Sequence, residues 1–166
     1  MRELVRDRDR LEHIVEAIDR ILGNTDFKSR DELDADNLRY YGIVKSIEII
    51  GEAAYKLTRA FCREHTETPW EFIAKMRHVL VHDYYQIKPA EVWKVINEDL
   101  HPLREQVRRY LSETDWEAWG KREDVIVEAT TNKNLEQTAR RMKAKGYPIE
   151  DIADITGLTA EEIKNL

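Results

Sequence analysis

The chain has 166 residues, a length that predicts one compact domain with an appendage rather than two full domains. Its 42% hydrophobic content supplies a core, and no apolar run approaches the roughly 20 residues of a membrane span or forms a signal peptide, so we expect a cytoplasmic protein. The single cysteine, Cys62, excludes an internal disulfide and a cysteine-based zinc site.

The net charge of −6 is distributed unevenly along the chain. Both ends are acidic, whereas residues 39–94 carry 9 basic and 7 acidic side chains. This middle segment therefore tolerates a polyanionic ligand such as RNA. An excess of two positive charges permits nucleic-acid contact without demonstrating it.

Helical periodicity recurs in four long segments, and no segment shows the sustained alternation of a strand. The first predicted helix runs from about Val5 to Leu22 and stops at Gly23. Its apolar side chains form one stripe: Leu11, Ile14, Val15, Ile18, Ile21 and Leu22. The second begins after Asp36, a suitable N-cap, and continues toward Phe61. Gly51 within it indicates a close helix crossing.

The third and fourth helices complete the expected bundle. The third starts at Thr68-Pro69-Trp70-Glu71, which combines a Thr cap, an early proline and an acidic first turn, and it should end near His82. The fourth begins at Pro89, with a kink expected at His101-Pro102. Short connections suit antiparallel neighbours, and the first connection is the longest and the one expected to be mobile. The predicted fold class is therefore an all-α antiparallel bundle with a short helical appendage.

We place the bundle at residues 1–111, a connecting segment at 112–132 and a helical tail at 133–166. In the tail, helices are predicted from Asn134, from Pro148 and after Thr159, in a helix-turn-helix-like outline. Thr159, with Glu162 three residues later, predicts a capping box for the last helix. The last eighteen residues, however, hold five acidic side chains and one lysine. Because this charge repels DNA phosphates, we expect the tail to pack on the protein or to contact another protein rather than to recognise DNA.

Candidate chemistry is concentrated in residues 76–84, where Arg77, His78, His82 and Tyr84 lie close in sequence. A histidine moves protons near neutral pH, and an arginine matches phosphate oxygens. RNA cleavage through the 2′-hydroxyl needs both functions and no metal. His78 and His82 lie four residues apart, as two zinc ligands on a helix would, but the sequence shows no third ligand, so a zinc site is weakly supported. The simpler alternative is structural: His78 and His82 are partly buried helix residues, and Tyr84 packs as an aromatic side chain at the edge of the core.

The helical positions of Arg77 and His82 limit how they can act together. On a continuous helix the two residues are about 140° apart, whereas Tyr84 is nearly in line with Arg77. Either the backbone leaves the helix before His82, or the site is completed by a second copy of the chain. We expect both.

Several motifs resemble one known family. Arg77-x4-His82-x-Tyr84 matches the R-x4-H-x-Y signature of HepT-like HEPN toxins. Residues 47–53 are similar to the family's I-x-x-I-G-E-A stretch, and further similarities surround the signature: Pro69-Trp70, Ile73, Met76, Val92-Trp93, Ile96, Asp99-Leu100 and Pro102-Leu103. The resemblance covers roughly residues 5–110.

The resemblance implies a HEPN-type homodimer that cuts RNA without metal or cofactor, with Arg77 and His82 as catalytic residues from both copies. It also implies a type VII toxin-antitoxin pair, in which a minimal nucleotidyltransferase antitoxin attaches AMP to Tyr84. His78 replaces the usual Asn, and with Lys75 it is a further candidate for substrate binding. The alternative is a non-enzymatic subunit that binds a nucleotide or a nucleotidyltransferase. The tail is not part of the usual toxin and is similar to the C-terminal segment of transposase-related nucleases.

Overall fold

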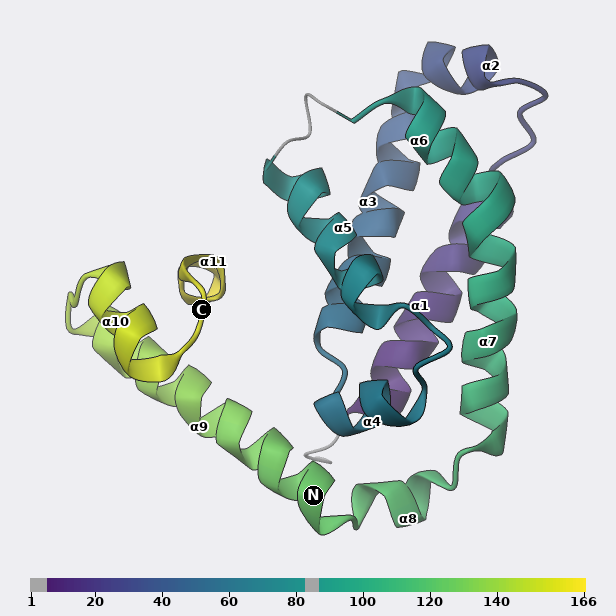
Figure 1. Cartoon of the computed structure of the whole chain (residues 1–166). Coiled ribbons are helices and arrows are strands. Elements are labelled where there is room, and N and C mark those ends of the chain that lie inside the picture. Colours follow the sequence, from purple (N-terminus) through teal and green to yellow (C-terminus); the bar gives the residue numbers. More distant parts are fainter. Residues whose placement is uncertain (1–5, 83–86) are drawn as a thin grey trace. The chain divides into compact units, whose positions relative to one another are not determined.

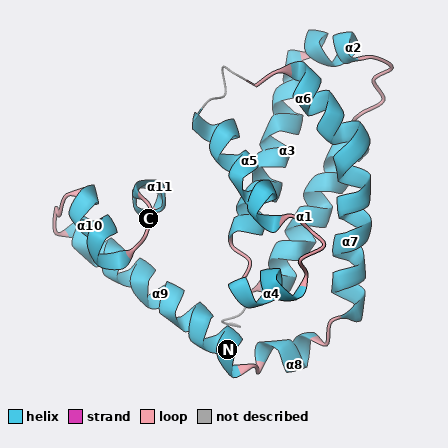
Figure 2. Ribbon diagram, viewed as in Figure 1, coloured by secondary structure: helices cyan, strands magenta, loops and turns pink. Residues whose placement is uncertain are grey.

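The computed structural model describes residues 6–76 and 87–166 in full and residues 77–82 as helical backbone. The described residues form helices and no strands, which confirms the predicted all-α class (Figures 1 and 2). The chain divides into two compact units, Arg6–Trp116 and Glu117–Leu166. Each is treated by itself below.

The first unit is a bundle whose central helices are α1 (Asp7–Leu22) and α3 (Asn37–Tyr55). α1 packs against α3 and α7 (Leu100–Glu113), and α3 also packs against α5 (Trp70–His82). Figure 1 shows α5 running back along α3 in the opposite direction. The apolar stripe predicted on α1 is confirmed, because Leu11, Ile14, Ile18 and Ile21 are all buried.

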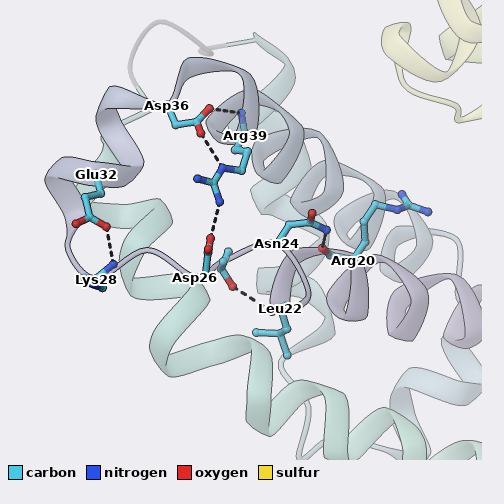
Figure 3. Close-up of polar contacts among 9 residues, drawn as sticks. Arg20, Leu22, Asn24, Asp26, Lys28, Glu32, Asp36 and Arg39 are labelled. Atoms are coloured by element: carbon cyan, nitrogen blue, oxygen red, sulfur yellow. Dashed lines mark hydrogen bonds and ion pairs between the residues drawn. The ribbon is translucent and has the colours of Figure 1, made fainter.

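The connection between α1 and α3 contains a short helix, α2 (Arg30–Ala35), where the sequence predicted only a long loop. Ser29 caps this helix, and the side chain of Leu33 within it is fully buried. Figure 3 shows Arg39 of α3 bridging two carboxylates, Asp26 at 2.5 Å and Asp36 at 2.7 Å. These contacts tie the connection to the start of α3.

α3 ends earlier than predicted, and α4 (Arg59–Glu64) follows as a separate helix. The cause lies 51 residues upstream: the buried carboxylate of Asp7 accepts hydrogen bonds from the Thr58 backbone N–H at 2.8 Å and the Thr58 hydroxyl at 2.7 Å. The Thr58 hydroxyl oxygen also accepts from the Phe61 N–H and so caps α4. A tertiary contact therefore breaks a segment whose periodicity alone predicted one helix.

The predicted fourth helix consists of α6 (Pro89–Lys94), a π-helical turn (Val95–Asp99) and α7. The irregularity lies one turn before the predicted kink at His101-Pro102. Pro102 has no N–H to donate to the carbonyl of Glu98, and its ring crowds that carbonyl. A wider turn at this point relieves the clash without ending the helix.

The second unit contains α9 (Glu123–Ala144), α10 (Ile149–Thr156) and α11 (Ala160–Asn165), after the short α8 (Trp116–Gly120). Its small core is made of Ala139, Ile152 and Ile163. The predicted capping box of Thr159 and Glu162 is confirmed. α9 begins eleven residues before the predicted Asn134, and the hydroxyls of Thr130 and Thr131 donate to carbonyls one turn earlier on the same helix.

Candidate functional site

The predicted site residues are gathered on or just after one helix. Lys75, Arg77, His78 and His82 all belong to α5. Of these, only the Lys75 side chain is described, and Tyr84 lies outside the described residues. The structure therefore fixes the helical positions of the four α5 residues.

α5 continues without a break to His82. This overturns one of the two expectations, namely that the backbone leaves the helix before His82. Arg77 and His82 consequently lie five residues apart on one continuous helix, about 140° apart around its axis. Lys75, His78 and His82 share one side of the helix within about 60°, while Arg77 belongs to a different side.

The beginning of α5 is anchored by buried aromatic side chains. Trp70 is buried, and its indole N–H donates to the carbonyl of His65 at 2.9 Å. The rings of Phe61 and Tyr110 lie 5.9 Å and 6.1 Å from the Trp70 ring. Thr68, predicted as the helix cap, is buried, and its hydroxyl lies 2.6 Å from the Tyr110 hydroxyl on α7. α5 thus starts from a fixed point in the bundle.

His65 is a histidine to which the sequence analysis gave no role. Its ring packs 4.3 Å from both Phe61 and Tyr110. Burial lowers the pKa of the His65 imidazole, although the nearby Glu67 and Glu64 raise it. A neutral imidazole among aromatic rings fits a packing role.

The chain that follows the motif is anchored at Ile87. The hydroxyl of Tyr40, on α3, donates to the Ile87 carbonyl at 3.3 Å. Burial raises the pKa of the Tyr40 phenol, and the neighbouring Tyr41, Asp34 and Glu91 raise it further. The phenol therefore keeps its donor proton at neutral pH. Sequence reasoning missed this residue, because Tyr40 and Ile87 are 47 positions apart.

Lys75 is exposed, and its ammonium group lies 2.7 Å from the carboxylate of Glu71 one turn earlier. It also borders a surface pocket of about 480 Å³ at the start of α5, with Cys62, Phe72 and five further residues: Thr66, Thr68, Pro69, Trp70 and Glu71. Cys62 also lines this pocket.

Two further properties concern only the fully described part of the chain. There, no three His, Cys, Asp or Glu side chains gather in a way that would hold a metal ion. None of the helices searched in that part combines the length and apolar character needed to cross a membrane.

Comparison with known proteins gives a consistent family. The model of the family "Ribonuclease HepT-like" matches residues 14–110. A protein of Thermococcus cleftensis named "Probable ribonuclease HepT" is 34% identical over 97 residues, which cover 58% of this chain and 88% of that protein. A "Putative RNase" of Caldanaerobacter subterraneus subsp. tengcongensis is 32% identical over 101 residues, covering 61% of this chain and 90% of that protein.

A longer relative matches this chain over only part of its own length. The "Gamma-glutamylcyclotransferase and putative RNase" of Methanocaldococcus jannaschii is 30% identical over 105 residues, or 63% of this chain. This chain spans only 47% of that protein. No solved structure matches this chain. The matching family model and the two shorter relatives, each covered over most of its length, show that this chain belongs to the HepT-like ribonuclease family.

Proposed function

We propose that the chain is a metal-independent endoribonuclease toxin that works as a homodimer, with Arg77 and His82 of both copies lining one cleft. The observation that carries this proposal is the unbroken course of α5 through His82. Because one helix holds Arg77 and His82 about 140° apart, a single α5 cannot easily direct both at one phosphate. In a symmetric dimer, Arg77 and His82 of a second copy approach the same phosphate from other directions.

The reaction follows from the two residue types. One His82 imidazole removes the proton from the RNA 2′-hydroxyl, whose oxygen attacks the adjacent phosphorus. The bond from phosphorus to the 5′-oxygen breaks, and the His82 of the other copy, in its protonated form, donates a proton to that oxygen. Arg77 stabilises the negative charge on the phosphate oxygens. The products are a 2′,3′-cyclic phosphate and a free 5′-hydroxyl.

The regulation that we propose acts through Tyr84. A minimal nucleotidyltransferase antitoxin transfers AMP to its phenol, forming a type VII toxin-antitoxin pair. The added phosphodiester carries a negative charge that can pair with Arg77, and its bulk competes with RNA for the cleft. Family membership and the position of Tyr84 two residues after His82 support this proposal.

His78 and Lys75 are proposed to assist substrate binding. They share one side of α5 with His82, and Lys75 is exposed at its start. Their contribution is to contact phosphates that flank the cleaved bond, since a lysine attracts phosphate as a point charge.

The proposed chemistry is tested by cleavage of a defined RNA by the purified protein in excess EDTA. We expect cleavage to continue at the same rate and to leave a 2′,3′-cyclic phosphate, because no metal activates water in this mechanism. Activity that disappears with EDTA and returns with magnesium or manganese would contradict the mechanism. RNA binding without any cleavage would instead support the alternative, a non-enzymatic subunit.

A further inference from the structure

The exposed face of α3 carries six side chains in a regular pattern. Their spacing along the helix is 3, 4, 3, 4 and 3 residues, which places them within about 100° of one another around the axis. We call this set the α3 strip: Leu38, Tyr41, Lys45, Glu48, Glu52 and Tyr55. The opposite face of α3 carries the residues that are buried in the bundle, such as Ile43, Ile47 and Ile50.

The ends of the α3 strip are apolar and open to solvent. Leu38 is 86% exposed, Tyr41 61% and Tyr55 42%. Leu38 and Tyr41 lie one turn apart and form an exposed apolar pair at one end of the strip, and Tyr55 lies at the other end. Between them lie one cation and two anions, Lys45, Glu48 and Glu52.

The strip is complementary to itself. Its spacing is the same in both directions, so its centre lies between Ser46 and Ile47. When a second copy of α3 is laid antiparallel across a two-fold axis at this centre, each position meets a different position of the partner. Lys45 then faces Glu48, Tyr41 faces Glu52, and Leu38 faces Tyr55. Each pair occurs twice, and each joins opposite charges, a phenol and a carboxylate, or two apolar groups.

We infer that two copies of this chain associate through the α3 strip, with their α3 helices antiparallel about a two-fold axis near Ser46. This inference rests on the proposed function, because it names the surface of the proposed homodimer. α5 packs directly on α3, so in a dimer built on the strip each copy of α5 is the direct neighbour of an interface helix. The isologous contact also closes the assembly at two copies.

Charge reversal at the centre of the strip tests this interface. Lys45→Glu places like charges opposite each other twice in every dimer, and Glu48→Lys does the same with the other sign. We expect each variant to raise the dimer dissociation constant roughly a hundredfold, measured by light scattering over a dilution series. Lys94→Glu on α6 is the matched control, because Lys94 and Lys45 are both 64% exposed and both neighbour a glutamate on their own helix or its continuation.

Mixing the two variants separates the interface from contacts within one chain. Lys45 and Glu48 also form an ion pair within one copy, at 2.8 Å. In either variant these two positions carry like charges within the same chain, and mixing the chains does not remove that repulsion. Across the interface, however, the Lys45→Glu chain is negative at both central positions and the Glu48→Lys chain is positive at both. Opposite charges therefore meet at both places, and we expect the mixture to form a heterodimer at wild-type concentrations.

The outcomes distinguish this inference from the proposed function. A heterodimer that forms but does not cut RNA supports the strip and contradicts the proposed ribonuclease. A Lys45→Glu variant that stays as dimeric as the control, whether or not its RNA binding is weakened, overturns the strip as the interface. Two variants that are each monomeric and remain monomeric when mixed also overturn it.

Discussion

The two halves of α5 differ in the residues they carry. Its first turn is locked into the bundle by Trp70, whose ring packs with those of Phe61 and Tyr110. Its second half carries Arg77 and His82. The bundle fixes one end of this continuous helix, and the residues that we propose to be catalytic lie toward its other end. Substitutions at the first end should therefore cost stability, and substitutions at the second should cost activity.

The largest expected effect is on catalysis. His82→Ala and Arg77→Ala should each reduce RNA cleavage by about a thousandfold, because they remove the proton-transfer group or the group that stabilises phosphate charge. Tm, measured by circular dichroism, should stay close to that of the wild type. If either variant unfolds, or if both cut RNA at the parent rate, the division of labour along α5 is wrong.

The next effect is on stability. Phe61 is fully buried, and Phe61→Ala should lower the free energy of unfolding by about 3–5 kcal/mol, because it leaves a cavity beneath the start of α5. Urea denaturation measures this loss, and Phe61→Leu serves as a milder control. Cleavage per folded molecule should be unchanged. A selective loss of cleavage in a variant of wild-type stability would show that the aromatic end has a catalytic task.

A smaller effect is expected at Tyr40, where the chain after the motif is held. Tyr40→Phe removes the hydrogen bond to the Ile87 carbonyl and should lower the free energy of unfolding by about 0.5–1.5 kcal/mol. We also expect a several-fold loss of cleavage, because the anchored Ile87 lies only five residues after His82, the proposed catalytic residue. Tyr147→Phe in the second unit is the control, since Tyr147 is about half exposed. If Tyr40→Phe and Tyr147→Phe have the same stability and the same cleavage rate, the hydrogen bond of Tyr40 does not hold the chain after the motif.

The sequence predicted those features that depend on neighbouring residues. The buried stripe of α1 and the capping box at Thr159 follow from local periodicity and local hydrogen bonds. The break after α3 was missed because it depends on Asp7, which lies far from Thr58 in sequence. The Tyr40 contact with Ile87 was missed for the same reason.

The candidate site shows the same limit. Motif spacing predicted that Arg77 and His82 diverge on a helix, but only the structure shows that α5 remains helical through His82. The early start of α9 was missed because its threonines and asparagine have modest helix propensity. In the helix that does form, the hydroxyls of two of these threonines donate to carbonyls of the preceding turn.

The central claim is that both copies contribute to one cleft, and a mixed dimer tests it most directly. Wild-type and His82→Ala chains carrying different affinity tags are co-expressed, and the heterodimer is purified by both tags in turn. The account predicts less than about a tenth of wild-type cleavage, because one imidazole cannot serve as base on one side of the phosphate and acid on the other. A heterodimer with half the wild-type activity, or a fully active monomer, would contradict the shared cleft.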